Sequence, residues 1–148
     1  MKITLTLSLV FLSYLALAQT QNEELFKAVV NRDSTQVEAL LNSGADPNYK
    51  RKAHSIEVGL LPMATINHDF KIVKLLVEHK VDINERDPLQ GTALLYAANQ
   101  GNVAMVKFLL EHGADPNAKD VQDHSVLDAA KWGGNEEVIK LIESALKK

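Results

Sequence analysis

Residues 91–117 read GTALLYAANQGNVAMVKFLLEHGADPN, and this stretch decides the fold because the chain repeats it at a fixed distance. Shifted back by 33 residues, Ala97 meets Ala64, and shifted forward by 33 it meets Ala130. Neither shift needs a gap. Self-similarity at such a period is typical of solenoids, in which each unit contacts only its neighbours.

A fourth copy of the pattern precedes these three. It covers residues 25–48 and ends in the same Gly-Ala-Asp-Pro-Asn as residues 113–117. Its Asp46 lies 36 residues before Asp82, where a spacing of 33 would be expected. The sequence therefore predicts three extra residues in the segment 49–59.

Each copy predicts two short helices separated by a glycine turn. Apolar residues recur at helical spacing in residues 93–99 and again, with bulkier side chains, in residues 103–111. Gly101 lies where the first helix must end, since a left-handed conformation is least costly for glycine. Thr92 and Ser125 are expected to cap the first helices with their hydroxyl groups.

An Asp-x-Asn sequence follows the second helix of each of the first three copies. It suits a turn into an extended loop, because both side chains can bond back to nearby backbone amides. The recurring Asp46, Asp82 and Asp115 are therefore interpreted as turn residues, and no catalytic role is needed to explain them.

The pattern resembles the ankyrin repeat, one unit of which is close to G-x-T-P-L-H-x-A-A-x-x-G-H-x-E-V-V-K-L-L-L-x-x-G-A-D-V-N. The resemblance covers residues 23–144. It implies an all-α solenoid of helix-turn-helix units joined by β-hairpin-like finger loops, with no cofactor and another protein as partner. We expect one such domain over residues 19–148, with repeats at about 23–55, 56–87, 88–120 and 121–146.

The end units differ from the inner ones, as the caps of a solenoid should. The first unit lacks a preceding hairpin and opens on residues 20–24, Thr-Gln-Asn-Glu-Glu, which predicts a helix N-terminus there. The last unit has Lys131 and Glu143 where apolar residues are expected. Both substitutions favour an outward-facing surface.

The second unit departs most from the family pattern. His68 and Lys80 stand where glycine is expected, and Pro62 falls within the first helix. These residues predict that the second unit is the least regular of the four.

Residues 1–18 have the layout of a secretory signal peptide. Lys2 precedes an apolar run over residues 3–17, and Ala-Leu-Ala at residues 16–18 precedes a polar stretch. We expect cleavage after Ala18 and no membrane insertion of the remaining chain. An uncleaved membrane anchor or a buried first helix is the alternative.

The composition places further limits on location and partners. The chain has no cysteine, which excludes disulfides and the lipid-modified cysteine of a bacterial lipoprotein. It has no Asn-x-Ser/Thr sequon, which favours a bacterial source and hence a periplasmic or secreted protein. Its formal net charge is −3, with no long run of one sign, so nucleic acid is not an expected partner. A monomer is expected.

The resemblance implies that the finger loops and the exposed sides of the first helices, the palm, bind the partner. Trp132 is a candidate because tryptophan often dominates interface energy, although it could instead fold onto the last unit. The basic residues 50–52 predict an acidic patch on the partner, unless they are only a solvated loop. The finger candidates are Lys50, Arg51, Lys52, His54, Arg86, Leu89, Gln90, Lys119, Val121, Gln122 and Asp123, and the palm candidates are Ile66, Asn67, Asn99, Gln100 and Trp132.

No catalytic constellation is recognisable in the sequence. There is no cysteine nucleophile, no G-x-S-x-G and no glycine-rich phosphate loop. His79 and His112 are expected about one unit apart, roughly 10 Å, which is too far to share a metal ion. The alternative function is a small metal-binding protein or hydrolase that uses surface histidines such as His54 and His68.

Overall fold

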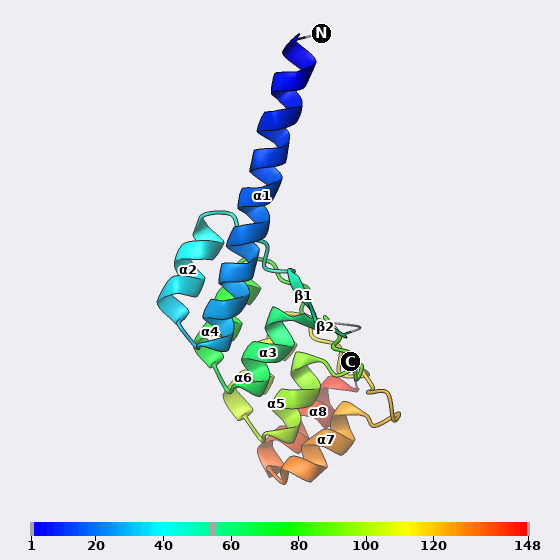
Figure 1. Ribbon diagram of the computed structural model, residues 1–148. Coiled ribbons are helices and arrows are strands. Elements are labelled where there is room, and N and C mark those ends of the chain that lie inside the picture. The colour runs from blue at the N-terminus through cyan, green and yellow to red at the C-terminus, as the bar shows by residue number, and fades with distance from the viewer. Residues whose placement is uncertain (1, 54–55, 148) are drawn as a thin grey trace.

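The computed structural model describes the backbone of residues 2–53 and 56–147 and the side chains of residues 16–52 and 56–147. Within these residues eight helices follow one another, interrupted by one two-stranded hairpin (Figure 1). The elements are α1 (Lys2–Val30), α2 (Ser34–Asn42), β1 (Lys50–Ala53), β2 (Ile56–Gly59), α3 (Leu60–Ile66), α4 (Phe70–Glu78), α5 (Ala93–Asn99), α6 (Val103–Glu111), α7 (Val126–Gly133) and α8 (Glu136–Ala145).

The helices form successive antiparallel pairs that stack side by side (Figure 1). In the row of first helices, α1 contacts α3, α3 contacts α5, and α5 contacts α7. The second helices form another row behind them, in which α2 contacts α4 and α6 contacts α8. The predicted solenoid of helix-turn-helix units is therefore confirmed.

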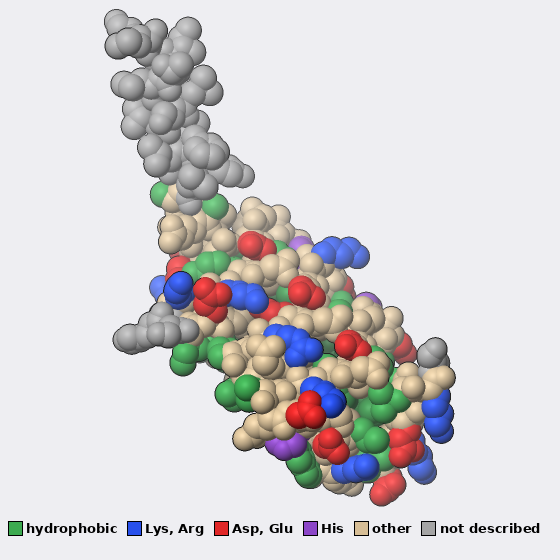
Figure 2. Space-filling view, turned by 90° about the vertical axis from the view of Figure 1, so that its right-hand side faces the viewer, with side chains coloured by type: hydrophobic (Ala, Val, Ile, Leu, Met, Phe, Trp, Pro, Cys, Tyr) green, Lys and Arg blue, Asp and Glu red, His purple; other side chains and the backbone are tan. Residues whose placement is uncertain are grey.

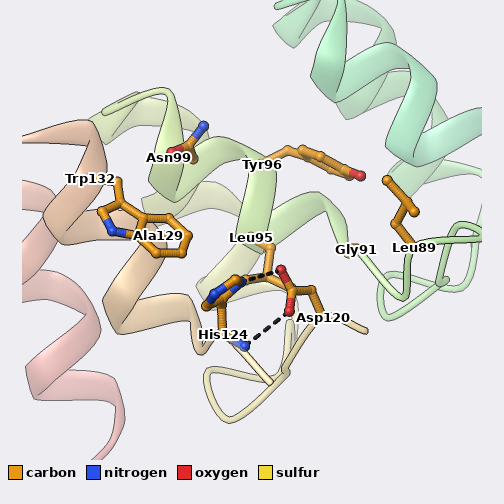
Figure 3. A pocket seen from close by; sticks show the side chains of 9 residues that line it. All are labelled: Leu89, Gly91, Leu95, Tyr96, Asn99, Asp120, His124, Ala129 and Trp132. Carbon is orange, nitrogen blue, oxygen red and sulfur yellow. Dashed lines mark hydrogen bonds and ion pairs between the residues drawn. The ribbon is translucent and has the colours of Figure 1, made fainter. Parts of the chain in front are cut away.

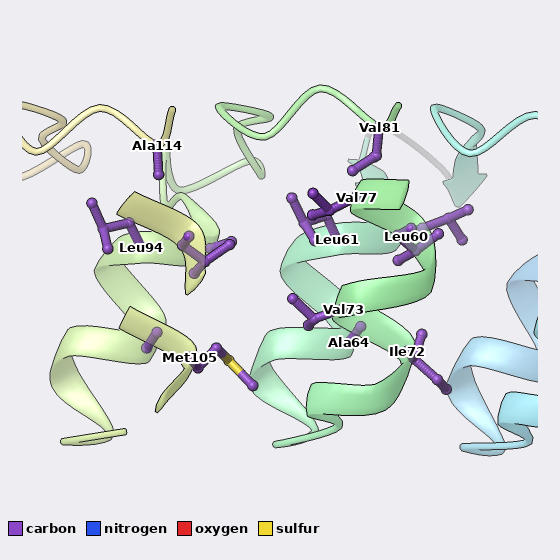
Figure 4. Close-up of a cluster of buried hydrophobic side chains, with 14 of the residues drawn as sticks. Leu60, Leu61, Ala64, Ile72, Val73, Val77, Val81, Leu94, Met105 and Ala114 are labelled. Atoms are coloured by element: carbon purple, nitrogen blue, oxygen red, sulfur yellow. The ribbon is translucent and has the colours of Figure 1, made fainter. Parts of the chain in front are cut away.

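One continuous apolar core runs through the stack (Figure 4). Leu60, Leu61 and Ala64 of α3 are fully buried against Ile72 and Val73 of α4. Alanine at the middle of the first helices is small enough to let neighbouring units approach closely. Each unit thus buries its two faces against the next, and no unit has a core of its own.

The helix ends are formed as the sequence predicts. Thr92 caps α5 by accepting a hydrogen bond from the Leu95 amide, and Ser125 forms a capping box with Asp128 at α7. Gly101 adopts a φ of +65° after α5, as expected for glycine at a helix reversal.

The second unit is as regular as the third, so the prediction that it is the least regular is wrong. α3 has the same length as α5, and α4 the same length as α6. His68 and Lys80 accept left-handed φ values of +58° and +66°, and each completes the same pair of turn bonds that glycine makes elsewhere. Pro62 lies in the first turn of α3, where its missing amide hydrogen has no intrahelical acceptor to lose.

The first helix does not begin at residues 20–24 as predicted. α1 is continuous from Lys2, and Thr20 donates its hydroxyl hydrogen to the Ala16 carbonyl inside the helix. The Thr20 hydroxyl therefore bonds within α1 and does not cap a helix N-terminus. The described part of the chain has no helix that is both long and apolar enough to span a bilayer.

The first finger, which is three residues longer than the others, contains an antiparallel pair of β-strands. β1 pairs with β2 in antiparallel register, from Lys50 opposite Gly59 to Ala53 opposite Ile56. The insertion in the segment 49–59 is thus accommodated by lengthening the loop, and the second helices on either side, α2 and α4, have the same length of 9 residues.

An asparagine ladder ties each turn between the second helices and the fingers to the next one. Each Asp of the Asp-x-Asn sequence bonds back to its own turn as predicted, whereas Asn48 and Asn84 reach the following unit, contrary to the prediction. The Asn side chain accepts a hydrogen bond from the backbone amide of the next Asp. These bonds join Asn48 to Asp82 at 2.7 Å and Asn84 to Asp115 at 2.8 Å. Asn22 of α1 makes the equivalent bond to Asp46 of the first unit at 2.8 Å.

Gly59 and Glu85 form a compensating pair at the start of α3. Gly59 occupies the capping position that Thr92 and Ser125 hold in later units, and the Glu85 carboxylate fills the space left by the missing side chain. A Cβ on Gly59 would lie 1.8 Å from Glu85 Oε1. The Glu85 side chain is 2% exposed, and Lys50 Nζ lies 3.6 Å from its Oε1. Burial raises the pKa of Glu85, although the charge of Lys50 opposes the rise.

Candidate functional site

The second and third fingers, residues 82–92 and 115–125, are closed by equivalent aspartates. In each finger one Asp oxygen accepts backbone hydrogen bonds from residues two and four positions later. Asp87 Oδ1 accepts from Leu89 and Gly91, and Asp120 Oδ1 accepts from Gln122 and His124, at 2.8–2.9 Å. Gln90 and Asp123 then take the left-handed conformation that reverses the chain.

A shallow hollow of about 210 Å³ lies between these two fingers and the helices α5 and α7 (Figure 3). Leu95 of α5 and Ala129 of α7 are buried beneath it. Trp132 projects from α7 on one side, and Leu89 of the second finger lies on the other (Figure 3). The hollow is lined by Leu89, Gly91, Leu95, Tyr96, Asn99, Asp120, His124, Ala129 and Trp132.

The imidazole of His124 lies between Trp132 and Asp120 (Figure 3). Its Nδ1 is 2.9 Å from Asp120 Oδ2, and its ring meets the Trp132 ring edge to face at 4.7 Å between centroids. Desolvation acts to raise the pKa of Asp120, but the hydrogen bonds from His124 and Gln122 outweigh it and lower the pKa. The carboxylate is thus held in its charged form.

Tyr96 closes the hollow at the second finger. Its hydroxyl donates a hydrogen bond to Asp87 Oδ2. Burial is the largest cause that raises the pKa of Tyr96, followed by this hydrogen bond and by the negative charges of Asp87 and Asp120. The hydroxyl therefore stays protonated and serves to fix the finger against α5.

Large apolar side chains are exposed around the hollow. Leu89, Val121 and Trp132 are each more than 60% exposed. Ile66 of α3, which does not line the hollow, is 43% exposed. Trp132 contacts His124 of the last unit and still exposes 61% of its surface. It therefore packs partly on the last unit and leaves most of its surface open to a partner. Clustered exposed apolar residues are typical of interaction sites.

Several predicted site residues are occupied by contacts within the protein. The Arg86 guanidinium donates to the carbonyls of Lys119 at 2.8 Å and Gln90 at 3.2 Å, and so ties the second finger to the third. The Gln100 side-chain amide donates to the Thr65 carbonyl at 3.0 Å, linking α5 to α3. Lys119 Nζ lies 3.0 Å from the Asp123 carboxylate. These polar groups of Arg86, Gln100 and Lys119 therefore stabilise the fingers and helices from within the protein.

The basic residues 50–52 are each paired with a carboxylate. The ion pairs are Lys50–Glu85 at 3.6 Å, Arg51–Glu23 at 3.7 Å and Lys52–Glu57 at 3.7 Å. Figure 2 shows acidic and basic side chains interspersed over the face turned toward the viewer. The triplet carries no surplus positive charge, which removes the basis for predicting an acidic patch on the partner.

The remaining predicted residues are divided between the hollow and its surroundings. Asn99 lines the hollow, whereas Asn67 is half-buried at the end of α3 and Gln122 is exposed at the tip of the third finger. The Val121 amide donates to the Leu89 carbonyl at 2.9 Å, so these two apolar residues lie side by side. His54 lies outside the described residues.

Sequence reasoning missed four side chains that shape the hollow, namely Leu95, Tyr96, Asp120 and His124. The 33-residue repeat contained one usable signal, since Asp120 is the equivalent of Asp87 and both precede a first helix by a short turn. The contact between His124 and Trp132 could not be predicted from the repeat, because it depends on how the loop and the first helix of the last unit fold onto each other.

In the part of the chain that the structure describes, the histidines show no arrangement suited to a metal. Within the described ranges, no three His, Asp or Glu side chains come together as a metal site requires. His79 and His112 end α4 and α6, and His112 Nδ1 lies 2.7 Å from the Phe108 carbonyl.

Comparisons with known proteins point to one family. A family model described as ankyrin repeats, in three copies, matches residues 25–120 and 61–147. A putative ankyrin repeat protein of Acanthamoeba polyphaga mimivirus is 35% identical over 75 residues, which are 51% of this chain and 9% of that protein. The human photoreceptor ankyrin repeat protein is 35% identical over 84 residues, 55% of this chain and 18% of that protein. The chain thus matches only a small part of either relative.

Proposed function

This chain belongs to the ankyrin-repeat family, and on that premise we propose that it is an exported module that holds one partner protein against its second and third fingers. Ankyrin repeats are protein–protein interaction modules and are typically not enzymes. The proposal therefore concerns where the partner binds and in which compartment.

The observation that carries the proposed site is the hollow between α5, α7 and the two fingers. Leu89, Val121 and Trp132 are the most exposed large apolar side chains of the described residues. Leu89 and Trp132 line the hollow, and Val121 lies beside Leu89. Tryptophan is among the residues that most often dominate binding energy, and exposed apolar residues gathered beside it are typical of an interaction site. The Arg86 bridge keeps the fingers in place, which lowers the entropic cost of binding.

The proposed export is supported by where the first helix meets the array. Among the described residues, Asn22 and Glu23 are the first residues of α1 whose side chains bond to residues after α1, namely to the Asp46 amide and the Tyr49 hydroxyl. Ala16 and Leu17 are exposed. Removal of residues 1–18 would therefore leave these bonds to the array in place, as a cleaved signal peptide requires. N-terminal sequencing of the mature protein should give Gln19, and a mature protein that still starts at Met1 would disprove cleavage.

Site-specific photo-crosslinking tests the binding surface. A photoreactive residue is placed at Val121 beside the hollow, or at Lys140 on the exposed surface of α8 as a matched control. Cells that make each variant are irradiated, and crosslinked products are identified by mass spectrometry. The Val121 position should yield one discrete partner that the Lys140 position does not, and Leu89→Asp should abolish that product. Identical products from both positions would contradict the proposed surface.

A further inference from the structure

The hollow has a negative electrostatic character. None of the residues that line it is Lys or Arg, and Asp120 is held charged. Asp87 lies behind Tyr96, and Asp128 lies at the start of α7, where its hydrogen bonds with Ser125 lower its pKa. The negative charges of Asp87 and Asp120 both reach the Tyr96 hydroxyl, since both help to raise its pKa.

The cations of the neighbouring fingers are committed elsewhere. Arg86 donates to the carbonyls of Gln90 and Lys119, and Lys119 Nζ is paired with Asp123 at 3.0 Å. Neither side chain lines the hollow. An incoming positive charge would therefore displace neither of these cations, and it would share the Asp120 carboxylate with the His124 imidazole, whose Nδ1 lies 2.9 Å from Asp120 Oδ2.

The shape of the hollow suits a long side chain with an apolar stem and a flat, charged end. Leu95 and Ala129 provide the apolar floor, and Trp132 offers an aromatic surface that is 61% exposed (Figure 3). The Asn99 amide lies at the edge of the hollow and has no hydrogen-bond partner among the described residues. An amide oxygen at that position can accept from a bound donor.

We propose that this hollow binds an arginine side chain presented by an extended segment of the partner protein. The proposal rests on the proposed function and deepens it by naming the chemistry of the contact. The methylene stem of arginine packs on Leu95 and Ala129, and the planar guanidinium lies on the Trp132 ring in the field of Asp120. A glutamate or aspartate in the same place would be repelled, and a lysine ammonium could not stack flat on the indole.

Trp132 is the single tryptophan of the chain, so its fluorescence reports on the hollow directly. The probe is the blocked peptide acetyl-Gly-Leu-Arg-Leu-Gly-amide, titrated into the mature protein. The matched peptide carries citrulline, which has the shape of arginine without its charge. We expect the arginine peptide to bind about tenfold more tightly than the citrulline peptide and to lose this advantage in high salt.

Two variants locate the effect. Asp120→Asn keeps a side-chain oxygen for the turn bonds of the third finger and removes the charge, so the preference for the arginine peptide over the citrulline peptide should fall. Glu111→Gln removes an exposed charge from α6 and should leave the preference for arginine unchanged. Circular dichroism checks that both variants are folded.

Three results would overturn the inference. Equal binding of the arginine and citrulline peptides to the unmodified protein would show that charge is not recognised. A lysine peptide that binds as tightly as the arginine peptide would show that a flat guanidinium is not required. A lack of response to any peptide would show that the hollow does not take such a side chain, and the crosslinking at Val121 would still decide the proposed function separately.

Discussion

At the scale of single residues, the chain places non-glycine residues at three helix reversals. Arg32, His68 and Lys80 have φ values near +60°, in the left-handed region that favours glycine. Such a conformation costs an L-residue about 1 kcal/mol or slightly more. The regular geometry around them shows that the packing of the units outweighs this local cost.

Replacing Lys80 by glycine should therefore stabilise the protein. The side chain is exposed, so little packing is lost, and relief of the left-handed strain should raise the free energy of unfolding by up to about 1 kcal/mol. Thermal unfolding followed by circular dichroism measures the change. The reverse control is Gly113→Ala at a φ of +92°, which should lower the melting temperature. A fall in melting temperature for Lys80→Gly would contradict the interpretation.

The buried Glu85 should make stability depend on pH. Burial raises its pKa above the ordinary value of 4.5, so the folded protein binds this proton more tightly than the unfolded chain does. The resulting stabilisation is fully present below pH 4.5 and is lost as the pH rises through the folded-state pKa. Urea unfolding at a series of pH values should show that the unmodified protein loses stability relative to Glu85→Gln as the pH rises toward 7. Parallel curves for the two proteins would show that this carboxyl does not titrate differently on folding.

At the scale of secondary-structure elements, the start of α3 depends on an exchange between two segments. Gly59 has replaced the usual capping hydroxyl, and the Glu85 carboxylate from the second finger occupies the vacated space. Gly59 and Glu85 depend on each other, because a side chain at residue 59 would collide with the Glu85 carboxylate.

A double-mutant cycle on Gly59→Thr and Glu85→Ala tests this exchange. Gly59→Thr alone should destabilise by about 1–3 kcal/mol through overpacking, and the double variant should recover the stability of the unmodified protein. We expect a coupling energy of about 1 kcal/mol or more from urea unfolding. Additive effects of the two substitutions would mean that the residues do not share the same space.

The asparagine ladder offers a second test at this scale. Asn84 accepts from the Asp115 amide and donates to the Gly113 carbonyl, so Asn84→Ala should cost about 1 kcal/mol of unfolding free energy. Asn117 is the matched control, because its side chain bonds only to Asp115 within its own turn. Asn117→Ala should therefore cost less. Equal losses in urea unfolding would mean that the bonds between units contribute nothing beyond the turn itself.

At the scale of the whole molecule, the first helix divides into a part that packs and a part that extends beyond the array (Figure 1). A chain that starts at Gln19 should melt at the same temperature as the full chain. A chain that starts at Leu25 lacks the hydrogen bonds of Asn22 and Glu23 and should melt at least about 5 °C lower, at about 1 kcal/mol per bond. Calorimetry on the three chains decides this. A large loss on removal of residues 1–18 would contradict the view that this segment is dispensable.

The sequence by itself determined the helix pairs, their order and their ends, except for the start of α1. A 33-residue period and apolar residues at helical spacing act locally, so Thr92, Gly101 and Ser125 could be assigned without coordinates. Even the longer first finger followed from counting residues. The irregularity expected of the second unit did not occur, because a modest backbone cost is small compared with the stacking of whole helices.

Only the tertiary structure decided which polar side chains are free for a partner. Arg86, Gln100 and residues 50–52 are polar and were predicted to be available, yet each is engaged within the protein. Arg86, Gln100 and Lys50 contact groups of a neighbouring unit. Arg51 pairs with α1, and Lys52 pairs across its own hairpin. The hollow beside Trp132 likewise depends on the distance between two fingers. A repeat pattern specifies which residues are equivalent, but hydrogen bonds and ion pairs act over a few ångströms between different units, and those distances exist only in the folded stack.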